Sequence, residues 1–396
     1  MRLSHRPAPA SLASAAPRAT ARVHRGLHPC LLPAALLGLL LPLTLAHSAG
    51  ALRLDPRTLP TAVKLWSRKL APDQTLVRGK IVYVKTGTGI TALDLKTGKL
   101  LWSRELGEVT CCSDDLVATP DTVAVPHDDK LYLFNAADGT LRAPTELGGS
   151  IIALAGPPLV AAVSLDTGAY ELVAVDTSTG LIRNRQPLAA GAVYDLAVEN
   201  GYAVVSGEGS SAGELTLTTG FSADGLKELW RFERQTYPQM QHVEDHLYLR
   251  EDARDSGPDS RFERLDPATG RLGAPLPPRR AGSGETGWPW ELQVVTGPPS
   301  GDPPDTEPQE SLRRNDLATG KPVWTVELPG HLHELAKDER NIYVECLTGG
   351  SRAILARVGW VKGDLQLLGF GLPNAQSLTA AGDLVLAATE DELAAY

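Results

Sequence analysis

The sequence contains little cysteine, methionine or phenylalanine. Its 396 residues include four Cys, two Met and five Phe. Cys30 lies in an N-terminal apolar run, so only Cys111, Cys112 and Cys346 remain for the rest of the chain. Three thiols cannot form the disulfide framework that holds many small secreted domains together. The fold must therefore rest on its own apolar core.

Acidic residues are absent from the first 48 positions, which carry five Arg. The remainder of the chain has 33 basic and 47 acidic residues, a net charge of −14. A chain this acidic lacks the positive field that attracts phosphate groups. We therefore expect that neither nucleic acid nor an anionic membrane surface is its partner.

The first 48 residues are typical of a secretory signal. Residues 1–29 are basic, Cys30–Ala46 has 17 residues without a charge, and Ala46–Ala49 offers small residues for cleavage. These features predict a signal peptide over residues 1–48, a linker over residues 49–60, and export to the periplasm or the extracellular space.

An uncleaved membrane anchor is the alternative interpretation of the same segment. A membrane-spanning helix needs about 20 apolar residues. The run here is shorter and contains Pro33 and Pro42. Cleavage is therefore favoured, and we expect no membrane span in the mature chain.

A repeated unit begins after the linker, and Lys80–Leu106 is its clearest copy. Short runs of β-branched and aromatic residues alternate there with glycine-containing turns, which predicts a meander of antiparallel strands. The turn Asp94–Gly98 has the pattern Asp-x-x-Thr-Gly. Asp can accept hydrogen bonds from backbone groups two or three residues on, and Gly can adopt the positive φ that closes such a hairpin.

The same turn recurs along the chain and sets its period. Four further copies end at Gly139, Gly180, Gly270 and Gly320, and weaker copies end at Gly225 and Gly363. Successive turn glycines are separated by 41, 41, 45, 45, 50 and 43 residues. A period of this size with four short strands per unit is the signature of a β-propeller blade.

The two ends of the repeat region together contain one more blade. Ala62–Leu70 nearly copies the fourth-strand sequence Gly98–Leu106, whereas Glu392–Tyr396 is a third-strand sequence with no fourth strand after it. We predict that these two segments pair, because closing the ring removes the exposed sheet edges. The predicted fold is an all-β, eight-bladed propeller over residues 61–396, with seven blades or a degraded eighth as the alternative.

These residues resemble the pyrroloquinoline-quinone-type repeat of bacterial quinoprotein-like propellers. The shared pattern is an alternating strand, Ala-Leu-Asp, a Thr-Gly turn and a strand that carries Trp. The resemblance implies that the strand tryptophans, which here are Trp66, Trp102, Trp230 and Trp324, dock between neighbouring blades. The family includes dehydrogenases and non-catalytic scaffolds such as the propeller subunit of the outer-membrane β-barrel assembly machinery. It therefore predicts the fold better than the function.

The adjacent pair Cys111 and Cys112 is similar to a feature of quinoprotein alcohol dehydrogenases. In that family, neighbouring cysteines between two blades form a disulfide that stacks on the quinone. Here the pair also follows a Trp strand, but the continuation Ser113–Leu116 departs from the family pattern, and no motif for a calcium site or a catalytic Asp is evident. A quinone site, a disulfide without cofactor and two ordinary thiols all stay open.

Histidines at the start of two predicted first strands are the other candidate ligands. His331 and His333 are one residue apart, which would place both on one side of a regular strand. His242 and His246 lie in the equivalent stretch two blades earlier. They could hold a metal in the central channel, or they could be ordinary channel or surface residues.

Two long, polar connections are predicted between second and third strands, Glu251–Asp259 in the fifth blade and Thr296–Gln309 in the sixth. They are either solvated insertions or a partner-binding rim, since propellers tolerate recognition loops outside their core.

Together these features predict an exported, monomeric, non-catalytic propeller that binds or scaffolds an envelope or extracellular protein and needs no cofactor. The first alternative is a quinone-dependent dehydrogenase that uses pyrroloquinoline quinone and calcium at Cys111 and Cys112. A glycan-binding propeller is the second alternative.

Overall fold

The computed structural model describes residues 61–107, 116–209, 215–234, 237–243, 246–252, 261–275, 291–296, 309–316, 319, 321–348, 353–372 and 375–396. The chain divides into two units, Met1–Ala51 and Leu52–Tyr396, and all described residues belong to the second. In this described part of the chain, no helix has the length and apolar character needed to cross a membrane.

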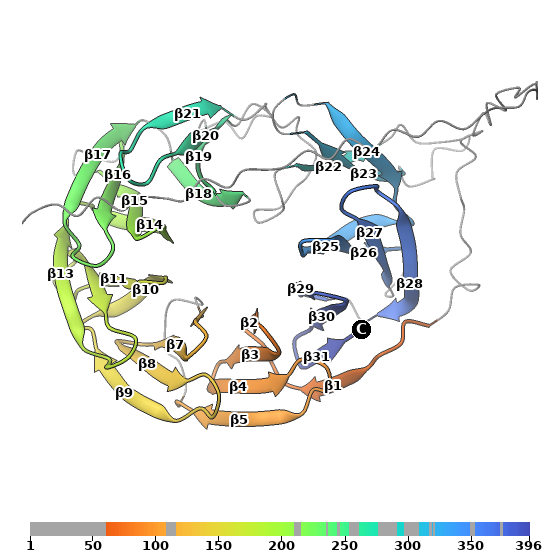
Figure 1. The fold of residues 1–396 in the computed structure, drawn as a ribbon, viewed down its shortest axis with the longest axis horizontal. Coiled ribbons are helices and arrows are strands. Elements are labelled where there is room, and N and C mark those ends of the chain that lie inside the picture. Colours follow the sequence, from red (N-terminus) through yellow and green to blue (C-terminus); the bar gives the residue numbers. More distant parts are fainter. Residues whose placement is uncertain are drawn as a thin grey trace, which may run out of the picture. The chain divides into compact units, whose positions relative to one another are not determined.

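The described residues form eight antiparallel sheets arranged around a ring (Figure 1). Seven sheets have four strands, and the sixth has three among the described residues. Within each sheet the first strand lies nearest the centre and the last lies on the outside. The prediction of an all-β, eight-bladed propeller is confirmed.

Each blade contains the following strands, from the centre outward. The first four blades contain β2 (Gln74–Arg78), β3 (Ile81–Thr86), β4 (Gly89–Asp94) and β5 (Leu100–Glu105); β6 (Val117–Ala118), β7 (Thr122–His127), β8 (Lys130–Asn135) and β9 (Leu141–Glu146); β10 (Ser150–Ala155), β11 (Leu159–Ser164), β12 (Tyr170–Val175) and β13 (Ile182–Leu188); and β14 (Ala192–Glu199), β15 (Tyr202–Glu208), β16 (Thr216–Ser222) and β17 (Glu228–Arg234). The last four contain β18 (Tyr237–Val243), β19 (His246–Asp252), β20 (Arg261–Leu265) and β21 (Leu272–Pro275); β22 (Leu292–Thr296), β23 (Glu310–Asn315) and β24 (Pro322–Glu327); β25 (His331–Lys337), β26 (Asn341–Leu347), β27 (Ala353–Gly359) and β28 (Leu365–Leu372); and β29 (Ser377–Ala381), β30 (Leu384–Ala388), β31 (Glu392–Ala395) and β1 (Trp66–Lys69).

Strand β3 explains why the second strands are apolar on both faces. Val82 and Val84 pack in a core cluster with residues of the eighth blade, such as Leu393. Tyr83, between them, packs in another cluster with Val123 of the second blade. Successive side chains of a strand point to opposite faces. Each blade therefore shares one apolar core with the blade before it and another with the blade after it.

The N-terminal strand completes the eighth blade, as the sequence predicts. In the antiparallel pairing of β1 with β31, Trp66 lies opposite Ala395 and Lys69 lies opposite Glu392. The amide of Leu65 continues the ladder by donating to the carbonyl of Ala395 at 2.9 Å. The first and last strands of the described chain thus close the ring.

The direction of the strands defines two ends of the ring. At the end that we call the turn end, first strands lead to second strands and third strands lead to fourth strands. At the other, the insertion end, second strands lead to third strands and each blade leads to the next. The predicted Asp-x-x-Thr-Gly turns therefore all lie at the turn end, and both long connections start and finish at the insertion end.

An indole ring joins each Trp-bearing outer strand to the next blade. The indole N–H of Trp66 donates to the carbonyl of Leu95 at 2.9 Å, and that of Trp102 donates to Ala136 at 3.1 Å. The carbonyl that accepts is each time that of the second residue in the neighbouring turn. Pro267 accepts from Trp230 at 2.9 Å, and Trp360 accepts from Trp324 at 3.0 Å.

The turn glycines make room for these indole rings. Gly98 has a φ of +62°, and a Cβ there would lie 2.5 Å from Cδ2 of Trp66. Gly139 and Gly270 have the same relation to Trp102 and Trp230. Gly180 also has a positive φ, of +75°. Gly320 lies outside the described residues.

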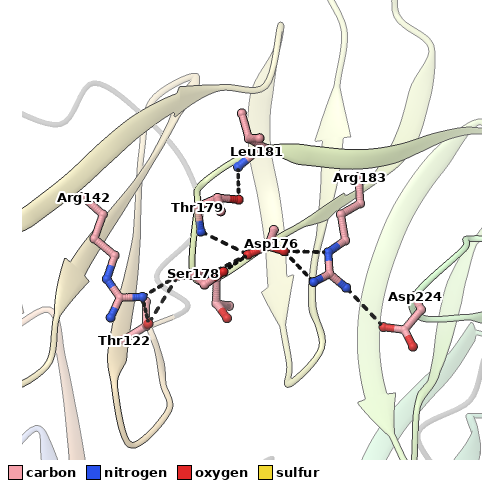
Figure 2. A network of polar contacts seen from close by, with 9 residues as sticks. Thr122, Arg142, Asp176, Ser178, Thr179, Leu181, Arg183 and Asp224 are labelled. Atoms are coloured by element: carbon pink, nitrogen blue, oxygen red, sulfur yellow. Dashed lines mark hydrogen bonds and ion pairs between the residues drawn. The ribbon is translucent and has the colours of Figure 1, made fainter.

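In two blades without a Trp, other side chains of the outer strand donate to carbonyls in the turn of the next blade. Arg142 of β9 donates from Nη1 to the carbonyl of Thr177 at 2.8 Å, which is the position where an indole would donate. On the far side of this turn, Arg183 forms an ion pair with Asp176 at 2.5 Å (Figure 2). Asn184 of β13 donates from Nδ2 to the carbonyl of Gly225 in the next blade. The polar junction between blades therefore persists where the repeat sequence has diverged.

Removing β1 tests the closure. A chain that lacks residues 61–70 should expose the edge of β31 and the apolar cluster around Leu393, and it should aggregate or melt at a lower temperature. The measurements are size-exclusion chromatography with light scattering and a thermal melt, with deletion of residues 52–60 as the control. A truncated chain that stays monomeric and melts like the parent would contradict the closure.

The Trp junction is tested with neighbouring residues of one strand. Trp102→Ala should lower the free energy of unfolding by about 3–5 kcal/mol, because it empties a buried site and removes a hydrogen bond. Leu101, its neighbour, is 42% exposed, so Leu101→Ala is the matched control. That control should change stability by no more than about 0.5 kcal/mol. The measurement is urea denaturation. If the two variants lowered the free energy of unfolding equally, the indole of Trp102 would have no special role.

Candidate functional site

The insertion end carries both long connections. In the fifth blade β19 ends at Asp252 and β20 begins at Arg261; in the sixth, β22 ends at Thr296 and β23 begins at Glu310. Residues 253–260 and 297–308 of these connections lie outside the described part of the chain. Two buried carboxylates lie at this end of the ring. Glu310 directly follows the second connection, and Glu345 lies one blade farther along.

Glu310 is the first residue of β23 and is 6% exposed. Its Oε1 lies 2.7 Å from Nδ1 of His331, and its Oε2 accepts a hydrogen bond from the amide of Leu332 at 2.8 Å. His331 and Leu332 begin the first strand of the next blade. Glu310 therefore binds the sixth blade to the seventh through a backbone amide and a histidine.

Glu345 makes the equivalent connection one blade later. It lies on β26 with no exposed surface, and both of its carboxylate oxygens accept from the amide of Ala375, at 3.1 and 3.3 Å. Its Oε2 also lies 3.2 Å from Nδ1 of His333. Burial raises the pKa of Glu345, while the contacts with Ala375 and His333 act in the opposite direction.

Cys346 follows Glu345 and points to the other face of β26. It packs in an apolar cluster with Leu332 and Ile342. Burial raises the pKa of its thiol further above the usual range. A buried, protonated thiol is a structural residue rather than a nucleophile.

The two histidines of β25 contact different carboxylates. The pairing of β25 with β26 has a register shift between Leu332 and Glu334, so His333 sits at an irregularity. The regular alternation from which the sequence predicted both histidines on one side is thus interrupted. Within the described ranges, no group of three or more His, Cys, Asp or Glu side chains could hold a metal ion.

The structure describes the remaining cysteine and histidine candidates only in part. Cys111 and Cys112 lie outside the described residues, in the connection between β5 and β6. Beside this connection, Nε2 of the buried His127 lies 3.3 Å from the carbonyl oxygen of Gly107. His246 Nδ1 lies 3.1 Å from Nη2 of Arg264. The structure does not describe the side chain of His242.

A separate groove of about 580 Å³ lies between the inner strands of the seventh and eighth blades. Leu335–Glu339 and Leu378–Ala380 line it, and its charged residues Lys337, Asp338 and Glu339 lie toward the turn end. Asp338 already accepts hydrogen bonds through Oδ1 from the amides of Arg340 and Asn341. The groove is therefore distinct from the carboxylates of the insertion end.

Sequence reasoning missed Glu310 and Glu345 because neither belongs to the repeated turn or to the Trp strand. A signal for Glu345 is nevertheless present. It interrupts the apolar run Ile342–Leu347, and a charged residue within a buried strand needs a partner. Glu310 directly follows the proline-rich connection, so the sequence does not show that it begins a buried strand.

A family model described as outer membrane protein assembly factor BamB matches residues 59–142 and 127–302, more than half of the 396 residues. The chain belongs to the BamB family. This agrees with the resemblance to quinoprotein-like propellers drawn from the repeat. No curated protein matches the sequence.

Solved structures share the fold of this BamB-family chain. The computationally designed Ika8 protein is 15% identical with a TM-score of 0.53, and the alignment covers 85% of this chain and 99% of that one. BamB from Moraxella catarrhalis is 13% identical, with a TM-score of 0.51 and coverage of 85% and 99%. A quinohemoprotein alcohol dehydrogenase from Comamonas testosteroni is 12% identical, with a TM-score of 0.51 and coverage of 85% and 76%. At these identities the likeness extends to the fold alone.

Proposed function

We propose that this chain is an exported, monomeric, non-catalytic propeller that binds or scaffolds a protein of the cell envelope during outer membrane protein assembly. The observation that carries the proposal is the match of residues 59–302 to the BamB family model. The acidic charge of the chain is consistent with a protein partner rather than with nucleic acid.

The geometry of the insertion end supports a scaffold. Glu310 and Glu345 are buried, and each accepts a backbone hydrogen bond from a neighbouring blade. A catalytic acid or base must instead reach a substrate proton. These carboxylates join blades, and we propose that the two long connections between second and third strands recognise the partner.

Capture of a partner from envelope extract tests the proposal. The mature chain should retain a specific envelope protein, and a variant with Ser300–Thr306 replaced by a Gly-Ser linker should lose it. The loop variant should melt close to the parent, since loop-closure entropy depends weakly on length. The control is Val361→Ser, which changes a residue that is 72% exposed at the turn end. Unchanged capture by the loop variant would remove this connection from the interface, and no specific capture would refute the proposal.

The quinone alternative depends on Cys111 and Cys112. Calcium takes six to eight oxygen ligands, and a quinone dehydrogenase also needs a group to accept the substrate proton. The two buried carboxylates of the insertion end do not fit these roles, because Glu310 and Glu345 are bonded to backbone amides. We therefore propose that the chain works without this cofactor.

Reconstitution distinguishes the two functions. The purified mature chain, mixed with pyrroloquinoline quinone and calcium, should neither acquire the absorbance of a bound quinone nor reduce a dye with alcohol or sugar. Cys111→Ser serves as the matched variant. Quinone-dependent turnover that disappears in this variant would establish the dehydrogenase instead.

A further inference from the structure

The seam between the seventh and eighth blades has an ionisable group in its core. Tyr343 and Glu345 lie two residues apart on β26, and Tyr343 packs in a cluster with Ala375 and Leu378. At the turn end the hydroxyl of Tyr343 donates to the carbonyl of Gly382 at 2.8 Å. At the insertion end, Glu345 holds the amide of Ala375, which precedes the first strand of the eighth blade.

Among the residues that the structure describes, few titratable groups lie around Glu345. On β25 these are His333, and Glu334 opposite Glu345 in the strand register. Cys346 is adjacent on β26, where its thiol also feels the charge of Glu310 from β23, and Tyr396 comes from the eighth blade. Burial, with the charges of Glu392 and Glu345, raises the pKa of Tyr396 to about 12, so its phenol stays neutral. Among these groups, histidine is the one that can become cationic in mildly acidic solution.

We propose that His333 and Glu345 form a proton-controlled latch that holds the seventh blade to the eighth at the insertion end. The closed seam holds one proton on the pair, and opening the seam to water releases it. In the closed seam that proton either makes an ion pair between His333 and Glu345 or neutralises the buried carboxylate. Each form avoids a buried, uncompensated negative charge.

The direction of the pH response follows from the burial of Glu345. Its pKa is raised in the folded chain, so the closed seam binds more protons than the open one. Closure is therefore complete at mildly acidic pH and weakens as the pH rises through the pKa of Glu345. For one linked proton the equilibrium between closed and open seams changes by up to about tenfold per pH unit. If the chain is exported, as proposed above, the latch responds to the acidity outside the cell.

Hydrogen exchange at the amide of Ala375 measures the latch directly. In the full mature chain, its protection, corrected for the intrinsic exchange rate, should fall as the pH is raised from about 5 to about 8. Glu345→Gln keeps an oxygen that can accept from Ala375 but cannot ionise, so protection in this variant should not depend on pH. Protection of Ala375 that is independent of pH in the parent, or a pH dependence that survives in Glu345→Gln, would overturn the proposal.

Two further variants keep the test specific. His333→Gln keeps an amide donor but cannot take up a proton, so its seam should open at a lower pH than that of the parent. An unchanged profile would also count against the latch. The matched control is Asp195→Asn, which alters a carboxylate that accepts from the amide of Met240 at 2.9 Å, between the fourth and fifth blades. Ala375 should keep the pH profile of the parent in that variant.

Discussion

The ring depends on one repeated contact, in which a donor on the outer strand of one blade reaches a carbonyl in the turn of the next. An indole ring lies directly over a turn glycine, which is where a side chain would otherwise project: a Cβ on Gly139 would come within 2.5 Å of Trp102. The turn must therefore keep glycine, and the glycine must keep its positive φ. The geometry of the turn and the packing between blades therefore constrain each other. This explains why the turn glycine and the tryptophan of the outer strand recur together in the sequence.

Because every blade packs only on its two neighbours, the first and last blades would leave an open seam without a closing strand. β1 closes it in two ways. It pairs with β31 inside the eighth blade, and its Trp66 reaches across to Leu95 in the first. A chain-terminal strand thus supplies both the in-sheet hydrogen bonds and the between-blade contact, so loss of this strand affects two blades at once.

The repeat allowed the fold and the closure to be predicted, because each blade has the same local solution and the copies reinforce one another. It did not predict the substitutes for Trp, since Arg142 and Asn184 reach their carbonyls with side chains that share no sequence pattern. Glu310 and Glu345 were missed for a related reason: each accepts a backbone hydrogen bond from the next blade, a tertiary contact that no local sequence pattern marks. The Cys111–Cys112 pair stays a prediction, because it lies outside the described residues.

Neighbouring blades are held together by different polar contacts at the two ends of the ring. At the turn end, indole, amide and guanidinium donors meet carbonyls, and none of these donors changes its protonation near neutral pH. At the insertion end, between the sixth, seventh and eighth blades, carboxylates meet amides and histidines. A buried carboxylate binds an amide more strongly than a neutral acceptor does, but its desolvation offsets much of that gain. The contacts between blades at the turn end are therefore insensitive to pH near neutrality. At the insertion end, the contacts that involve carboxylates can change in strength with pH.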